Sequence, residues 1–207
     1  LKLSRKVLES NGAVVKSFRA PALRINENTV RALEETGFTS DSSVSSRRID
    51  SFLSYGTMKK LNWLLSPVKP YRMSSNSPFR KGNSSVVQIP ISSLGFGYIG
   101  STMRASPMLN NLIGNYLMSE SFRKKTPLVF LFHPNEILDY DSFSHVKRRS
   151  KGYFSYLIRD VLRRRVKTRN LGFNAIELLE KLIIKAKNRG FEFITVKDYL
   201  EIHKDNL

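Results

Sequence analysis

A strand, a helix and a second strand follow one another closely near the start of this chain, and they constrain its fold more than any other feature. The first run, Val14–Arg19, contains β-branched and aromatic residues and stops before Pro21, as strands do. The second run, Phe38–Val44, has the same character. Strands that flank a helix at this spacing usually pair in parallel, so the sequence predicts an α/β fold.

The helix between these strands has recognisable ends. Asn26 or Asn28 can cap its N-terminus, because either side chain can accept a hydrogen bond from the first turn. Gly37 can end the helix after Glu35. The positions predicted to face inward are Val30 and Leu33.

Three further strands are expected. Val86–Ile91 contains Pro90, which marks an edge strand or a strand end. Leu128–Phe132 is continuously apolar, so it is predicted to be buried on both faces. Phe191–Ile194 closes the chain's strand pattern, and together with Val14–Arg19, Phe38–Asp41 and Leu128–Phe132 it is expected in one mainly parallel sheet.

The remaining segments are predicted to be helices, a loop and a turn. Residues Ser45–Ser85 are rich in serine, proline and basic residues, which favours an insertion or a long loop. Gly95–Gly100 is predicted to form a turn with glycine at both ends. The expected helices are Leu1–Ser10, Met58–Leu65, Pro107–Phe122, Tyr153–Arg169, Ala175–Lys187 and a short one from Val196.

Composition limits the class of protein. With 207 residues and 41% hydrophobic residues, the chain can bury one core, and residues 1–207 are expected to form a single domain. The absence of cysteine excludes disulfides and thiolate chemistry, and three histidines remain for imidazole chemistry. No apolar run reaches the roughly 18 residues that a membrane span needs. None of these features identifies a compartment.

The chain is strongly basic. It has 35 Lys and Arg against 17 Asp and Glu, a formal net charge of +18, which attracts polyanions and anionic surfaces. The densest runs are Lys147–Lys151 and Arg163–Lys167. No zinc-finger spacing, RNA-binding aromatic signature or clear helix-turn-helix accompanies them, which disfavours nucleic acid as the partner. A solvated basic face, or attraction to an acidic polymer or lipid surface, is the favoured interpretation.

Three motifs, in this order, resemble the polysaccharide deacetylases of the carbohydrate esterase type. Ser17–Pro21, a helix and then Gly37–Ser43 are similar to the family's Arg-x-Pro motif and the Asp-bearing strand end after it. Leu131–Glu136 is similar to the late histidine motif, and Gly190–Leu200 to the closing strand and helix. The resemblance implies a distorted (β/α) barrel of the polysaccharide deacetylase type, incomplete in this chain and forming its C-terminal part.

The resemblance also implies a chemistry and a set of site residues. The family hydrolyses N-acetyl or O-acetyl groups on a sugar polymer with a divalent, zinc-like metal. Carried over by motif, His133 is the general acid, and Arg19 and Asp41 form a charge pair that orients the catalytic aspartate. Tyr98 and Phe132 are placed to line the substrate site. The implied partner is a polysaccharide or amino-sugar substrate.

The chain departs from the family in one respect. The motifs that supply the base and the metal ligands, Thr-Phe-Asp-Asp-Gly and His-x-x-x-His, would precede Leu1, and nothing in the sequence replaces them. His145 and His203 are isolated, and no two histidines have metal-ligand spacing. We therefore expect that the chain is truncated and that an upstream segment or a partner chain completes the barrel. We expect no deacetylation by these residues alone.

Two alternatives remain open. The chain could be a degenerate module that binds only a carbohydrate or an anionic surface, or a basic nucleic-acid-binding protein. The deacetylase hypothesis makes a geometric prediction, because parallel strands place their C-terminal ends on one side of a sheet. Arg19 and Asp41 should lie within salt-bridge reach, roughly 4 Å, and His133 should lie across the same cleft.

Overall fold

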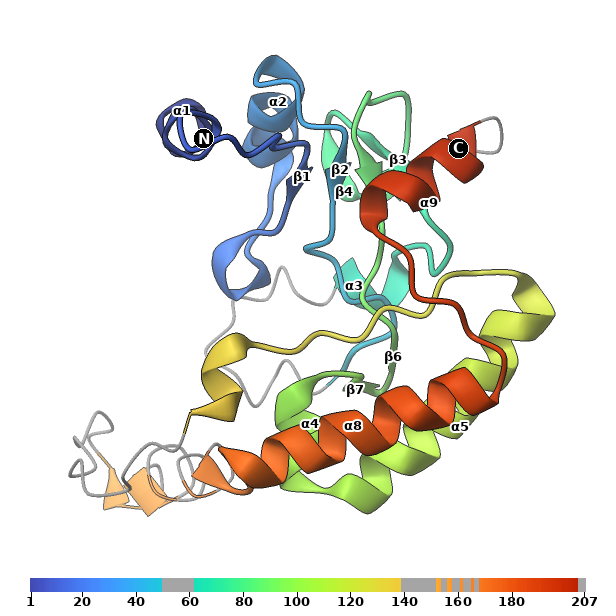
Figure 1. The fold of residues 1–207 in the computed structure, drawn as a ribbon. Helices are drawn as coiled ribbons and strands as arrows, with labels where there is room; N and C mark the ends of the chain where they lie inside the picture. The colour runs from blue at the N-terminus through green and yellow to red at the C-terminus, as the bar shows by residue number, and fades with distance from the viewer. Residues whose placement is uncertain are drawn as a thin grey trace.

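The computed structural model describes residues 1–49, 62–138, 152–153, 156–157, 161, 165 and 168–204. Its centre is a mixed five-stranded sheet with helices around it (Figure 1). The strands, in spatial order, are β1 (Ser17–Phe18), β2 (Ser40–Asp41), β5 (Val87–Gln88), β3 (Tyr71–Ser74) and β4 (Ser77–Lys81). The predicted α/β class is confirmed, whereas the sheet is open, with β1 and β4 at its edges, and is not a closed barrel.

The parallel half of the sheet arises from the predicted strand, helix and strand. β1 pairs in parallel with β2, and β2 with β5, so that Phe18 lies beside Asp41 and Asp41 beside Gln88. The intervening helix α2 (Glu27–Glu35) buries Val30 and Leu33 completely, as predicted. β5 lies in the middle of the sheet, and it ends before Pro90 because proline has no N–H to donate.

The antiparallel half corrects the predicted loop at Ser45–Ser85. Within this region, β3 and β4 form a hairpin, and β3 also pairs antiparallel with β5. The expectation of a mainly parallel sheet was therefore wrong. Residues of β3 alternate between buried and exposed, with Tyr71 and Met73 facing the core. The alternation extends over only four residues, so it could not be recognised within the serine-rich region.

Two predicted strands do not join the sheet as expected. Leu128–Phe132 contributes a single parallel bridge, between Leu131 and Ile99, and it is only half-buried except at Leu131. Because four of its five residues are only half-buried, the prediction of burial on both faces was wrong. Among the described residues, its backbone bonds to one neighbouring segment, Ser92–Gly100. Phe191–Ile194 is extended but belongs to no strand, and Phe193 is 59% exposed. The backbones of Phe130, Phe132 and Phe193 bond to no other described residue.

Most of the described helices agree closely with the sequence pattern, but the helix Gly100–Ala105 was not predicted. The predicted helix Tyr153–Arg169 lies mostly outside the described residues. The helices at the N-terminus, after Pro107 and in the C-terminal part begin and end within a few residues of their predicted limits. Of the helix predicted near Met58, the structure describes only the C-terminal end. Their bounds are α1 (Lys2–Glu9), α3 (Asn62–Leu65), α4 (Gly100–Ala105), α5 (Pro107–Lys124), α8 (Phe173–Asn188) and α9 (Val196–Ile202). Among the described residues, none of the helices is long and apolar enough to cross a bilayer.

Short 3-10 turns and a further hairpin connect these elements. The 3-10 turns are η1 (Pro21–Leu23) and η4 (Pro134–Ile137). The predicted glycine turn is a tight hairpin of β6 (Ser93–Leu94) and β7 (Phe96–Gly97), in which Gly95 has a φ of +69°. The basic runs Lys147–Lys151 and Arg163–Lys167 lie outside the described residues, except for the exposed Arg165.

The described residues form three apolar core clusters. The largest packs α2 against the sheet through Val30, Leu33, Phe38, Trp63, Tyr71 and Met73. A second cluster joins Ile91, Ile99 and Leu131 with Leu23 from η1 packed against it. The third joins Tyr98 to Ile113 and Leu117 of α5. In Figure 1, α4, α5 and α8 form a layer at one end of the sheet, and the Leu128–Phe132 segment runs between this layer and the strands.

Candidate functional site

The ends of β1 and β2 bring Arg19 beside the turn that contains Asp41. The Arg19 guanidinium donates from Nε to the Ser42 carbonyl at 2.9 Å and from Nη2 to the Ser42 hydroxyl at 2.8 Å. The predicted direct ion pair between Arg19 and Asp41 is not formed. Both guanidinium bonds go to Ser42, while the carboxylate turns back into its own turn. The two residues are therefore neighbours whose side chains make no direct hydrogen bond or ion pair with each other.

The Asp41 carboxylate is held by the turn that follows it. Only 1% of the residue is exposed. Its Oδ2 accepts from the Ser43 N–H at 2.8 Å and its Oδ1 from the Ser43 hydroxyl at 2.6 Å, while the same hydroxyl accepts from the Ala20 N–H at 2.8 Å. The Gln88 amide, oriented so that its nitrogen faces the carboxylate, donates to Oδ2. Ser43 therefore ties the Asp41 turn to the loop that carries Arg19.

Burial controls the charge of this carboxylate. It raises the pKa of Asp41 from 3.8 to about 6, although hydrogen bonds from Ser43 and the nearby charge of Arg19 act in the opposite direction. Burial also lowers the pKa of Arg19, against the effect of Asp41. A carboxylate that no solvent reaches cannot contact a substrate. Asp41 is therefore suited to positioning its neighbours, whereas Arg19 is exposed.

His133 follows a segment that packs against the same loop. Leu131, two residues before it, contacts the cluster of Ile91 and Ile99 to which Leu23 of η1 also belongs. The His133 side chain is exposed, and its backbone N–H donates to Glu136 Oε1 at 3.2 Å. The structure thus brings the ends of β1 and of the Leu128–Phe132 segment together through Leu23.

A buried ion pair that the sequence did not reveal fixes the turn after His133. Glu136 Oε2 accepts from Arg104 Nε at 2.6 Å, and both side chains are almost completely buried. Arg104 also donates to the Arg169 carbonyl at 2.9 Å. The pair connects η4, α4 and the approach to α8. No spacing signal could have identified it, because its partners are 32 residues apart.

Tyr98 and Phe132 both line one apolar groove, in which each forms a different part of the wall. The groove has a volume of about 670 Å³, and further lining residues are Leu128, Phe130, Leu182, Phe191, Phe193 and Tyr199. Tyr98 is 1% exposed and contacts the Phe130 ring edge-on, with 4.9 Å between centroids. Its main role is in packing, whereas Phe132 is only half-buried. The aromatic lining suits the apolar faces of sugar rings.

The described residues do not fit the metal that the family resemblance implies. Among them, no three His, Asp or Glu side chains are grouped so that they could hold a metal ion. Asp41 is surrounded by serine and glutamine, and Glu136 is occupied by Arg104. Among the described residues, His133 makes no hydrogen bond with Arg19 or Asp41, and none of these three residues lines the aromatic groove. The candidate site therefore has separate parts, which are the turn of Arg19 and Asp41, the exposed imidazole and the groove.

Comparison of this chain with protein-family models gives no match. The curated proteins and the solved structures give no match either. The case for any function therefore rests on the chain's own motifs and on the geometry described above.

Proposed function

We propose that this chain is the C-terminal portion of a deacetylase-like domain that hydrolyses N-acetyl or O-acetyl groups on a sugar polymer. The observation that supports it most is the adjacency of Arg19 and Asp41 at the ends of two parallel strands. Both residues belong to the first of the three motifs, and the resemblance requires them to meet. A bond between the Ala20 N–H and Ser43 joins the same two turns.

In the proposed reaction, His133 acts as the proton donor. A base that the upstream segment would supply takes a proton from water, and the water oxygen adds to the acetyl carbonyl carbon. The bond between that carbon and the sugar nitrogen then breaks, and the proton from His133 goes to the leaving nitrogen. The products are acetate and a free amine on the sugar. The His133 side chain is exposed, so a substrate nitrogen can approach it.

Arg19 and Asp41 act as positioning residues in this proposal. Arg19 fixes the turn at Ser42, and Asp41 fixes it at Ser43, so that the loops after β1 and β2 keep one arrangement. Phe132 and the aromatic groove would contact the sugar polymer beside the reacting group. Tyr98 supports that wall from behind.

The finer fold assignment, a distorted deacetylase-type barrel, is also part of the proposal. Its support is that Leu128–Phe132 and Phe191–Ile194 are extended segments with backbone groups that bond to no other described residue. Unpaired strand edges are sites where further strands can pair. An upstream segment or a partner chain would complete the barrel there.

Because the described residues hold no suitable group of metal ligands, we expect this chain alone to release no acetate from N-acetylglucosamine oligomers. The first test is the coding sequence immediately upstream of the Leu1 codon. An in-frame Asp-Asp strand end and a His-x-x-x-His helix start would support hydrolysis. Their absence would remove the catalytic proposal.

The second test measures acetate release by the chain extended with that upstream segment. His133→Ala should abolish release because the leaving amine loses its proton donor, and thermal stability should change little because the side chain is exposed. His145→Ala is the matched control, since it also removes one imidazole and His145 belongs to none of the three motifs. Full activity in the His133 variant would overturn its assignment as the acid.

The second candidate function is a carbohydrate- or anionic-surface-binding module without catalysis. The lack of a metal-ligand group among the described residues favours it, and so does the aromatic groove. Co-sedimentation of this chain with an insoluble N-acetylated polysaccharide separates the hypotheses. Binding that Phe132→Ala weakens, together with no acetate release by the extended chain, would establish the module in place of the enzyme.

A further inference from the structure

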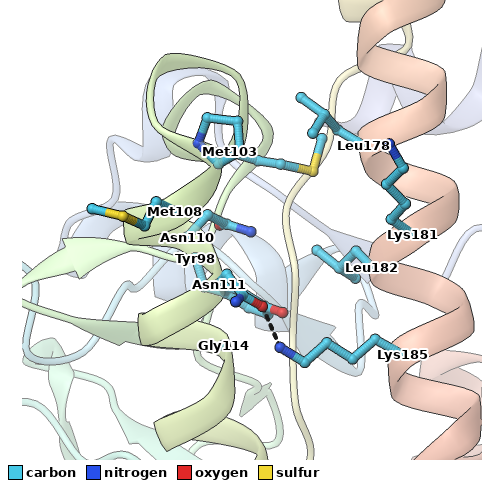
Figure 2. A pocket seen from close by; sticks show the side chains of 11 residues that line it. Tyr98, Met103, Met108, Asn110, Asn111, Gly114, Leu178, Lys181, Leu182 and Lys185 are labelled. Carbon is cyan, nitrogen blue, oxygen red and sulfur yellow. Dashed lines mark hydrogen bonds between the residues drawn. The ribbon is translucent and has the colours of Figure 1, made fainter.

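A second cavity lies between α5 and α8, and it shares Tyr98 and Leu182 with the wall of the aromatic groove. It has a volume of about 360 Å³ and is lined by residues of α4, α5 and α8 and by Tyr98. Figure 2 shows the α8 side chains Leu178, Lys181, Leu182 and Lys185 facing the α4 and α5 side chains across it. This volume is near the lower end of the range for ligand sites, which suits a small molecule.

One wall of the cavity contains a buried amide with an unsatisfied oxygen. Asn110 of α5 is 6% exposed, and its Oδ1 has no hydrogen-bond partner among the described residues. A buried polar atom without a partner is unfavourable, and a donor on a bound molecule would offset that cost. The site therefore calls for a ligand with an O–H or N–H group.

The opposite wall is basic. α8 contributes Lys181 and Lys185, and no Asp or Glu is among the described residues that line the cavity. Lys185 Nζ donates to the Asn111 amide oxygen. Burial, and then the charge of Arg189, lower the pKa of Lys185, which an anion beside it would reverse.

The rest of the lining is apolar. Met103, Met108, Leu178 and Leu182 surround the space between the amide and the lysines. Methionine side chains adapt to the shape of what they contact. Gly114 shapes the wall, because a Cβ at this position would lie 2.7 Å from the Tyr98 hydroxyl oxygen.

We propose that this cavity binds a small organic acid that combines a carboxylate, an apolar body and a hydrogen-bond donor. The carboxylate pairs with Lys185 and Lys181, the apolar body lies between the methionine and leucine side chains, and the donor reaches the Asn110 amide. All three features of the ligand follow from groups that line one cavity.

The probe that tests this is 4-hydroxyphenylacetate, which carries all three features. Phenylacetate lacks the donor, and 4-hydroxyphenylacetamide lacks the charge. Titration of the full chain, followed by ligand-detected NMR, should give saturable binding with a Kd of about 1 mM, as expected for a ligand of this size. Each control compound should bind about tenfold more weakly, because each lacks one polar interaction.

Variants separate this site from general attraction to a basic protein. Lys185→Gln should weaken binding about tenfold. Lys187→Gln makes the same charge change on α8 outside the cavity and should leave the Kd unchanged. Asn110→Leu should remove the preference for the hydroxylated acid over phenylacetate. Equal losses in the two lysine variants, equal affinity for all three compounds, or no saturation at about 10 mM would overturn the proposal.

Discussion

At the scale of single residues, the strand-end turn shows what motif positions can and cannot predict. The sequence placed Arg19 and Asp41 together, and the structure confirms that they are neighbours. It could not predict that Ser42 would take both guanidinium bonds, or that Ser43 would hold the carboxylate. Serine offers a donor and acceptors in any orientation of its hydroxyl, so which partner it satisfies depends on the folded turn.

The buried carboxyl of Asp41 leads to a pH prediction. Its pKa is raised from 3.8 to about 6, so the folded state holds the proton more tightly than the unfolded state. Below about pH 3.8 the group is protonated in both states, so its burial does not lower the free energy of unfolding. As pH rises from 3.8 through about 6, the free energy of unfolding decreases by roughly 3 kcal/mol in total. Asp41→Asn should remove that decrease, measured by urea unfolding at pH values between about 4 and 8.

Asp198 is the matched control, because its pKa is shifted in the opposite direction. Hydrogen bonds from Thr195 lower the pKa of Asp198, so this carboxylate stabilises the fold at neutral pH and loses its effect as pH falls. Asp198→Asn should therefore lower stability near pH 7, whereas Asp41→Asn should raise it relative to the native chain. The same sign in both variants would contradict the account of Asp41.

At the scale of elements, helices were predicted better than strands. The caps and periodicity of α2 and α5 lie within each helix, so the sequence contains them directly. A strand depends on its neighbours. Leu128–Phe132 is more apolar than β3, yet within the described part of the chain β3 has partners on both sides and Leu128–Phe132 has one. Apolar composition alone could not distinguish these cases, because pairing is decided by distant segments.

The structure decides which asparagine caps α2. Thr29 N–H donates to Asn26 Oδ1 at 3.0 Å, whereas Asn28 is exposed within the helix. Asn26→Ala should therefore lower the free energy of unfolding by about 1 kcal/mol. Asn28→Ala should leave it unchanged or raise it slightly, because alanine favours helix more than asparagine. Urea unfolding of the two variants measures this, and equal losses would show that Asn26 is not the cap.

At the scale of the whole molecule, the buried pair of Arg104 and Glu136 links segments that are distant in the sequence. It joins α4 to η4, and through the Arg169 carbonyl it reaches the start of the α8 region. Gly100 lies against the same carboxylate, because a Cβ there would be 2.5 Å from Glu136 Oε2. The turn that follows His133 is therefore fixed from the centre of the molecule.

Removal of one partner should be much more costly than removal of both. Glu136→Leu leaves the Arg104 charge buried and unpaired by this carboxylate, and we expect a loss of about 3–5 kcal/mol in the free energy of unfolding. Arg104→Met combined with Glu136→Leu should recover part of that loss. The control is Glu177→Gln, whose exposed pair with Lys181 spans 4.0 Å and should contribute less than about 0.5 kcal/mol. Additive losses in the double variant would contradict coupling.

The pairing of the sheet has a consequence for how fast the chain folds. The β3–β4 hairpin closes over a few residues, whereas the Ser17 and Ser40 hydroxyls meet across 23 residues and those of Ser45 and Ser93 across 48. Local contacts form before distant ones, because closing a long loop costs more entropy. We therefore expect the hairpin to appear early as a template on which β5 and then β2 and β1 add, so that refolding is limited by the parallel pairs.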